Sequence, residues 1–459
     1  MNNAPTLGPR GWAIVCGGLA LAARLPLAFD RYDASLVPDA GGYLRLADGL
    51  LAGRGYPTDY RTPGYPAFIA LIQLLPGRRE DVLVLLQHLI GVALVVAVLL
   101  VTWRWFGRAS AIAASVLAAL APILINVEHE VLPDFLFGLI VLGGTLLLAE
   151  ACAASSPRVG VLLAVGVVYG IATYVKPTGQ VLLFAAVVPL AFATRSLRRT
   201  VTGSAALACG LALTVSPWIV RNGLEYGNYV MSIQGPQALY LRVFDQDRLP
   251  VPTETPEGRL AARIGAQTRA RTPAEVEVTE SYSYVLNTLL DRGLEPDEAV
   301  AIQGELAVTA IRRDPLAYAA GTARNFFVIG AYSSEPRQPL AGLLLKLDGT
   351  ESPLPRPLVA APWVVGAALA LVWLLVSIGG LAAIGLLFTG SRPARVRALT
   401  LASVWVLVAA ATALTSAPNS RYAAQIVPLY WMLGSGGAAL VLRATHRRLK
   451  RTSEVAQRR

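Results

Sequence analysis

Residues 82–103 read VLVLLQHLIGVALVVAVLLVTW and contain no Asp, Glu, Lys or Arg. A helix needs roughly 20 consecutive apolar residues to cross the hydrocarbon core of a bilayer. A backbone inside lipid must also satisfy its own hydrogen bonds, and a single continuous stretch does so only as a helix. The stretch therefore predicts a membrane-spanning helix.

Similar apolar stretches recur along the chain and predict an all-α polytopic membrane protein with about ten transmembrane helices. The predicted spans are residues 11–29, 82–103, 109–126, 134–152, 159–175, 178–194, 201–220, 359–388, 398–416 and 423–442. Composition agrees, because only 15% of residues are charged and the mean hydropathy is +0.53, whereas a soluble domain carries about 25% charged residues.

The net charge of +11 does not predict nucleic-acid binding. Its basic residues are scattered through short loops and the C-terminal tail instead of forming one basic face. The cysteines, Cys16, Cys152 and Cys209, lie in or beside apolar stretches. They predict neither a disulfide framework nor a cysteine metal site.

Basic residues in short loops predict the orientation, because Lys and Arg accumulate on the cytoplasmic side. Arg104, Arg195, Arg392 and the tail all fall on one side when the spans are counted. We therefore expect a cell-membrane protein with both termini in the cytoplasm. The predicted organisation is a seven-span catalytic module at 1–220 that includes an outer loop at 30–81, an α-rich extracytoplasmic segment at 221–357, a three-span module at 358–443 and a basic cytoplasmic tail at 444–459.

The first outer loop holds the most informative residues. Asp39 follows the first span, and Tyr43 comes four residues later, which places both on one face if the segment is helical. Gly and Pro residues then turn the chain back toward the membrane. From spacing alone, Asp39 is a candidate catalytic base, with a helix N-cap as the alternative role.

Several motifs, taken in order, resemble a known family. They are PDAGGYLRLADGLLAGRGYP at 38–57 with RTPGYPAFIALI at 61–72, LPDFLF at 132–137, YVKP at 174–177, SPWIVRN at 216–222, AIRRDPLAY at 310–318 and RY at 421–422 with Pro428. Together they resemble the GT-C superfamily of membrane glycosyltransferases, nearest to the branch of protein O-mannosyltransferases and lipid A aminoarabinose transferases. Lys176 stands where the family often has Arg, which keeps the charge but loses the bidentate fork.

The resemblance implies an inverting glycosyltransferase with a polyprenyl-phosphate monosaccharide as donor. Asp39 and Asp134 are its catalytic candidates. The candidates for binding the donor phosphate are Lys176, Arg221, Arg421 and Arg61, and those for acceptor binding or support are Tyr43, Tyr65 and Glu130. We expect Lys176, Arg221 and Arg421 to meet in one pocket, with Asp39 facing the cations across a gap wide enough for a sugar.

Glu128, His129, Glu130 and Asp134 form a polar cluster in a short predicted outer loop. Such side chains could hold a divalent ion such as Mg²⁺, Mn²⁺ or Zn²⁺, so a metal cofactor stays open, with the first three residues as candidate ligands. A solvated turn is the alternative. An outer-loop carboxylate is the expected partner of Arg24, because an unpaired charge within a span is costly.

Two other functions stay open on sequence grounds. A transporter or flippase of a lipid-linked sugar would also be polytopic, but transporters usually show repeated halves or polar residues at mid-membrane. A scaffold without chemistry would leave the Asp39 loop unexplained. The expected partners are the polyprenyl-phosphate sugar, membrane lipids and an acceptor that is a glycan, lipid or protein. The sequence identifies neither the sugar nor the acceptor.

Overall fold

The computed structural model describes residues 7–28, 39–272, 280–330, 385–387, 390–417 and 420–457. These residues form helices joined by turns, and no strand occurs among them. The predicted all-α fold is therefore confirmed. The predicted span at 359–388 lies outside the described residues except for 385–387.

Five described helical segments are long and apolar enough to cross a membrane. They are α4 (Arg79–Phe106), α7 (Asp134–Ala153), η2 (Pro177–Phe184) with α9 (Val187–Thr194), α10 (Leu197–Tyr226) and α18 (Arg392–Thr415). A sixth is the pair α5 (Arg108–Leu120) and α6 (Pro122–His129), bent by 47° where Pro122 interrupts the helix. The protein is thus a polytopic membrane protein, and the full number of crossings stays a prediction.

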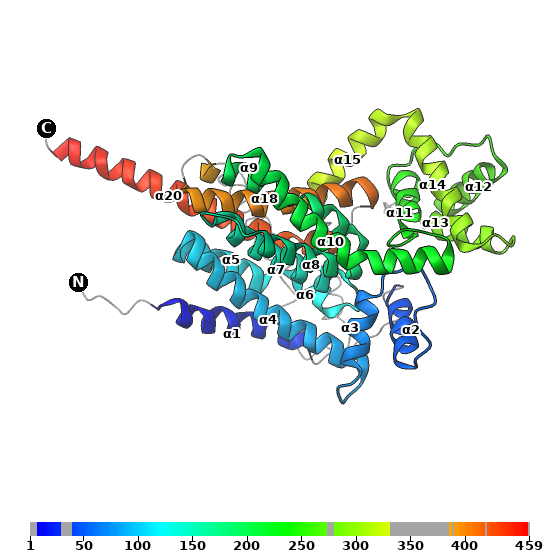
Figure 1. Cartoon of the computed structure of the whole chain (residues 1–459), viewed down its shortest axis with the longest axis horizontal. Helices are drawn as coiled ribbons and strands as arrows, with labels where there is room; N and C mark the ends of the chain where they lie inside the picture. The colour runs from blue at the N-terminus through cyan, green and yellow to red at the C-terminus, as the bar shows by residue number, and fades with distance from the viewer. Residues whose placement is uncertain are drawn as a thin grey trace.

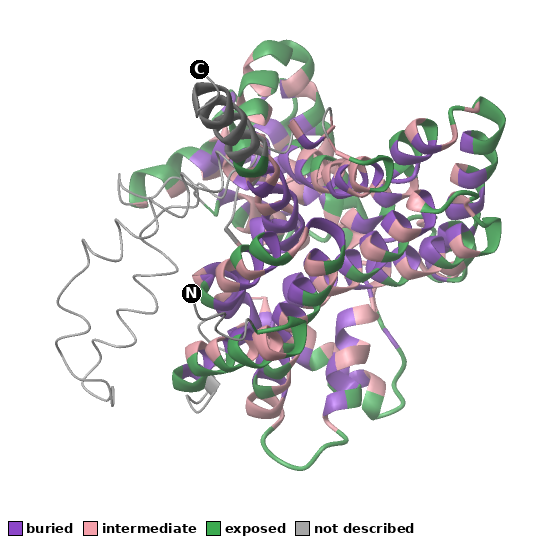
Figure 2. Ribbon diagram, turned by 90° about the vertical axis from the view of Figure 1, so that its left-hand side faces the viewer, coloured by how far each residue is buried: buried purple, intermediate pink, exposed green. Residues whose placement is uncertain are grey.

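Three more helices occupy stretches predicted as spans. They are α1 (Pro9–Ala28), α8 (Val159–Val175) and α20 (Val427–Gln457). Large apolar side chains on the bundle surface are exposed, among them Ile14, Leu100 and Leu213. Figure 2 shows buried residues where helices face one another and exposed residues on the outward faces. These outward apolar faces suit a lipid environment.

Both chain ends lie at one end of the helix bundle (Figure 1). The opposite end, here called the distal end, carries α2 (Ala40–Leu51), α3 (Gly64–Ile72) and the small helices from α11 to α15. The two segments predicted to lie outside the cell therefore meet at the same end of the molecule. That end carries the candidate site.

Close packing of α8 against α10 sets where their distal ends lie. Gly166 of α8 lies against the Leu207 carbonyl, and Gly210 of α10 lies against the Leu163 carbonyl. A Cβ at either glycine would collide with the facing backbone. Small residues allow this approach, as at many helix contacts in membranes. The pair carries Lys176 and Arg221 at its distal ends.

The distal helices form a small domain with its own apolar core, which includes Tyr240, Phe244 and Leu306. Its elements are α11 (Gln234–Tyr240), the π-helix η3 (Leu241–Gln246), α12 (Pro256–Arg271), α13 (Ser281–Leu290), α14 (Pro296–Arg313) and α15 (Pro315–Gly330). Buried Arg242 ties the domain to the bundle, because its Nε lies 3.3 Å from the Ala413 carbonyl of α18.

Candidate functional site

A cavity of about 430 Å³ opens at the distal end, between the bundle and α11. Its walls come from the start of α2, the start of α7, the α8–η2 junction, α18 and α19 (Ser420–Ala424). Six of the residues singled out from the sequence line it, namely Asp39, Tyr43, Arg61, Asp134, Lys176 and Arg421. The fold therefore gathers residues that are far apart in the chain into one charged chamber, here called the donor cavity.

Asp39 occupies the N-cap position of α2, but its side chain makes no capping hydrogen bond. Instead, one carboxylate oxygen lies 2.8 Å from Nη2 of Arg61 and the other lies 3.6 Å from Nη1 of Arg421. Asp39 therefore takes the N-cap position considered from the sequence, but its side chain does not cap the helix. Burial raises the pKa of Asp39, but the two guanidinium groups outweigh it and hold the pKa below its ordinary value.

The expected gap between Asp39 and the cations is also absent, and this expectation is corrected. Arg61 closes directly on the carboxylate, because the loop after α2 folds back over the start of that helix. Asp39 is 38% exposed, so a ligand can reach it. To accept a proton, the carboxylate needs a lone pair that Arg61 and Arg421 do not occupy.

Asp134 and Lys176 form a second ion pair, 2.8 Å long, deeper in the donor cavity. Asp134 begins α7, and Gln425 Nε2 donates to the same carboxylate oxygen at 2.5 Å. Lys176 lies where α8 ends in an extended residue before Pro177. Its ammonium is 4.1 Å from the ring centre of Tyr422. The pair places a cation and a buried carboxylate beside the space that Asp39 borders.

Arg221 lies outside the donor cavity, so the expected meeting of three cations there is wrong in part. Its guanidinium lies over the rings of Trp218 and Tyr226, and it donates to the carbonyls of Tyr56 and Thr58. The cause is its position on α10, from which the side chain reaches the first outer loop. Arg221 therefore anchors that loop, while Lys176 and Arg421 share the cavity.

Tyr43 and Tyr65, both singled out from the sequence, pack against each other beside the charged groups of the donor cavity. The Tyr43 ring lies 4.3 Å from the Arg61 guanidinium carbon and packs edge-on against Tyr65 at 5.3 Å. Burial raises the pKa of Tyr43 to about 12, so its hydroxyl stays protonated at neutral pH. Tyr65 is fully buried, donates to Gln87 Oε1 at 3.2 Å and does not line the donor cavity. Tyr65 therefore supports Tyr43 from behind the cavity wall.

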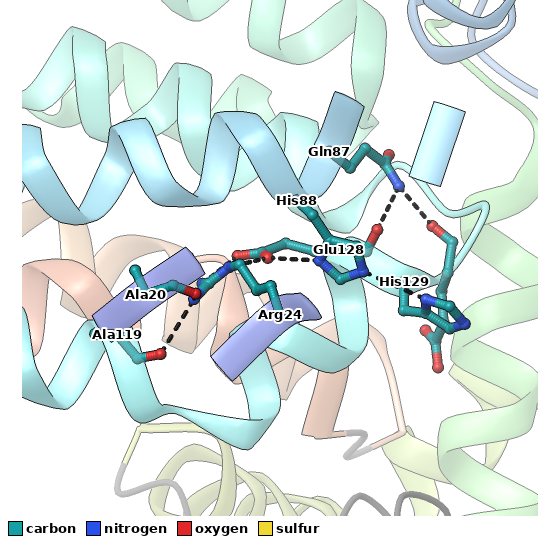
Figure 3. A network of polar contacts seen from close by, with 8 residues as sticks. Ala20, Arg24, Gln87, His88, Ala119, Glu128 and His129 are labelled. Atoms are coloured by element: carbon teal, nitrogen blue, oxygen red, sulfur yellow. Dashed lines mark hydrogen bonds and ion pairs between the residues drawn. The ribbon is translucent and has the colours of Figure 1, made fainter. Parts of the chain in front are cut away.

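The predicted cluster of Glu128, His129, Glu130 and Asp134 does not assemble. Glu128 points into the bundle, where its two oxygens lie 2.6 and 2.7 Å from Nε and Nη2 of Arg24 (Figure 3). Asp134 instead belongs to the donor cavity. Within the described residues, no group of three His, Cys, Asp or Glu side chains is arranged to hold a metal. The candidate metal ligands are thus corrected, whereas the carboxylate partner expected for Arg24 is confirmed.

Figure 3 shows that the Arg24 pair continues into a buried polar network. His88 Nδ1 lies 3.1 Å from Glu128, and His88 Nε2 lies 3.3 Å from Nδ1 of His129. Gln87 Nε2 donates to the carbonyls of Glu128 and Glu130 at 2.9 and 3.0 Å. The network fixes the chain between α6 and α7, and so supports Asp134 at the start of α7.

Sequence reasoning missed Gln425, and it named Tyr422 only as part of the RY motif, without a role. Gln425 follows Arg421 by four residues, which is the spacing that brings helical side chains to one face. The sequence therefore carried a signal for Gln425, namely its distance of four residues from the Arg of the RY motif. The interaction of Lys176 with the Tyr422 ring had no sequence signal, since the two lie far apart in the chain.

Residues 60–220 match the family described as dolichyl-phosphate-mannose-protein mannosyltransferase. The resemblance to GT-C membrane glycosyltransferases that the sequence motifs indicate is thus confirmed over this region. The matched region contains Arg61, Asp134 and Lys176, whereas Asp39 and Arg421 lie outside it. No curated protein matches the sequence.

Several solved structures show a weak similarity to this chain, with TM-scores below 0.5. The apo oligosaccharyltransferase of Archaeoglobus fulgidus is 14% identical over 98% of this chain and 52% of its own, with a TM-score of 0.47. AglB of the same organism, in complex with an inhibitory peptide and a dolichol-phosphate, is 15% identical over 98% of this chain and 52% of its own, with a TM-score of 0.47. ArnT of Cupriavidus metallidurans, bound to undecaprenyl phosphate, is 18% identical over 88% of this chain and 77% of its own, with a TM-score of 0.40. The chain thus spans about half the length of the archaeal enzymes.

Proposed function

We propose that this protein is an inverting glycosyltransferase that moves a sugar from a polyprenyl-phosphate monosaccharide to an acceptor on the extracytoplasmic side of the cell membrane. The family match over residues 60–220 supports glycosyl transfer. The donor cavity carries the proposal, because Asp39, the buried Asp134–Lys176 pair and Arg421 all line it. Such a reaction needs a base for the acceptor and cations for the departing phosphate.

In the proposed reaction, Lys176 and Arg421 bind the donor phosphate. An acceptor hydroxyl oxygen attacks the anomeric carbon from the opposite face, and its bond forms as the bond from carbon to phosphate oxygen breaks. The proton of the hydroxyl passes to the Asp39 carboxylate. The polyprenyl phosphate leaves with its charge stabilised by the two cations. Attack from the face opposite the phosphate inverts the anomeric centre.

Asp134 has a separate role in this scheme. Its carboxylate is buried and already accepts from Lys176 and Gln425. It therefore holds the Lys176 ammonium in the cavity. The sequence placed Asp134 with Asp39 as a catalytic candidate, and it remains the second candidate for the base.

The direct test is turnover by the purified protein in liposomes with a radiolabelled polyprenyl-phosphate sugar. A transferase breaks the sugar–phosphate bond, whereas the alternative, a flippase, moves the lipid intact. Asp39→Asn keeps the shape but loses the charge, and it should lower turnover by roughly 10²–10⁴-fold with donor binding little changed.

Asp48→Asn is the matched control, because Asp48 lies on the same helix and pairs with Arg79 outside both the donor cavity and the reaction. It should transfer sugar at the wild-type rate. Near-wild-type transfer by Asp39→Asn would remove Asp39 as the base and make Asp134 the next residue to replace. Movement of intact donor without cleavage would overturn the transferase itself.

A further inference from the structure

A second cavity, of about 600 Å³, lies between α2 and the loop that follows it. One wall is a single face of α2, on which Gly42, Arg45, Leu46 and Gly49 are spaced three or four residues apart. The other wall is residues 54–61 of the loop, including Arg54, Thr58, Tyr60 and Arg61. We call this cavity the arginine groove.

Positive charge dominates the arginine groove. Arg45, Arg54 and Arg61 line it, and none of its lining residues is acidic. Arg45 and Arg54 are exposed, and neither forms an ion pair with another described residue. Asp48 of α2 does not line the groove and pairs with Arg79. Two cations without a counter-charge, beside a third that is paired with Asp39, favour an anionic ligand.

Arg61 joins the arginine groove to the donor cavity, because it lines both. Its Nη2 donates to Asp39, while its Nη1 is buried and has no hydrogen-bond partner in the part of the chain that the structure describes. Leaving a buried donor unpaired is unfavourable. An anion in the groove would attract this guanidinium and compete with Asp39 for it.

The loop wall is held in place before any ligand binds. Arg221 donates to the Thr58 carbonyl at 3.1 Å and to that of Tyr56. The Tyr60 hydroxyl donates to Gln237 of α11. Contacts from α10 and from α11 of the small domain therefore fix this wall of the groove. A ligand that binds in the groove need not order the loop first.

We propose that the arginine groove binds a phosphate group carried by the acceptor substrate. The inference rests on the proposed function, in which the donor phosphate already has Lys176 and Arg421. Arg45 and Arg54, which line the groove, are exposed, so the groove suits a ligand arriving from water. A phosphate there attracts Arg61, loosens the Arg61–Asp39 pair and frees Asp39 for the acceptor hydroxyl.

The test measures binding without any donor, so its outcome does not depend on whether transfer occurs. The full chain, in nanodiscs of neutral phosphatidylcholine, is titrated with glycerol 3-phosphate by calorimetry, with glycerol as the uncharged comparison. Wild-type protein should bind the phosphate and not glycerol. Arg45→Gln/Arg54→Gln should weaken binding by about tenfold or more, since hydrogen bonds to charged groups are strong.

The control is Arg263→Gln/Arg292→Gln, which removes the same charge from exposed positions of the distal domain outside both cavities. It should bind like the wild type. Equal loss in both double variants would reduce the effect to overall charge and overturn the proposal. Unchanged binding in Arg45→Gln/Arg54→Gln, with loss in Lys176→Gln, would place the phosphate in the donor cavity and also overturn it.

A last arm separates an acceptor phosphate from a bilayer headgroup. Nanodiscs containing phosphatidylglycerol should leave the affinity for glycerol 3-phosphate within about twofold once ionic strength is held constant. Displacement of the probe by phosphatidylglycerol would assign the groove to the membrane surface and refute its use by the acceptor.

Discussion

Replacing Arg24 by Leu should destabilise the protein strongly, although Arg24 lies far from the proposed chemistry. The Arg24 and Glu128 side chains are 1% and 0% exposed and form a two-point ion pair. Arg24 Nη1 also lies 3.1 Å from the carbonyls of Ala20 and Ala119. Removing the guanidinium leaves the Glu128 carboxylate buried with His88 as its remaining polar partner among these side chains.

Breaking a buried pair by removing one partner typically costs 3–5 kcal/mol, and we expect Arg24→Leu and Glu128→Leu each to lower the free energy of unfolding by about that amount. The double variant Arg24→Leu/Glu128→Leu should be far more stable than the sum of the two losses. It replaces the pair by two apolar side chains and leaves no unpaired buried charge, which is often neutral. The coupling energy should thus be roughly 3 kcal/mol or more.

The assay is denaturant-induced unfolding of the purified protein in mixed micelles, with all three variants compared under one condition. Arg79→Leu is the control, because its pair with Asp48 is partly exposed and should contribute less than about 1 kcal/mol. Losses below about 1 kcal/mol for Arg24→Leu and Glu128→Leu would refute the reasoning. Strictly additive losses in the double variant would refute it as well.

Three more predictions follow from the structure. Gly91→Ala should lower stability by roughly 3 kcal/mol, because its Cβ would collide with the Glu128 carboxylate; Gly143→Ala, with open space, should change unfolding by less than about 1 kcal/mol. Burial raises the pKa of Asp39, but Arg61 and Arg421 lower it by more, so the acid limb of a pH–rate profile should lie below the ordinary pKa of an aspartate, and an acid limb near neutral pH would contradict this. Cysteines at Ala52 and Thr253, in a cysteine-free background, should react with an impermeant reagent in intact cells; protection of both until permeabilisation would reverse the orientation.

Hydropathy predicts most of the bundle because lipid imposes one dominant rule, that apolar helices are long and charges lie between them. The described helices follow the predicted spans closely. The bend between α5 and α6 is an exception, since the sequence predicts one span at residues 109–126 and no bend, although Pro122 lies inside them.

The site was harder to predict than the helices, because spacing along one helix says little about where a long side chain ends. Lys176 and Arg421 entered the donor cavity as expected, but Arg221 turned to the first outer loop. Glu128 looked like a loop residue beside Asp134, yet it faces Arg24 on a helix 104 residues away in sequence. Such pairings depend on helix rotation and packing, which one sequence does not specify.

The separation of Arg24 from Glu128 also has a consequence for biosynthesis. Glu128 emerges from the ribosome 104 residues after Arg24, or roughly 5–20 s later at ordinary rates of synthesis. Until then the first helix holds an Arg whose insertion into lipid costs about 2.5–3.5 kcal/mol. We expect α1 to stay beside the insertion machinery until α6 is made. Site-specific crosslinking of nascent chains checks this: chains that end before residue 128 should crosslink α1 to the machinery, and chains long enough to expose α6 should release it.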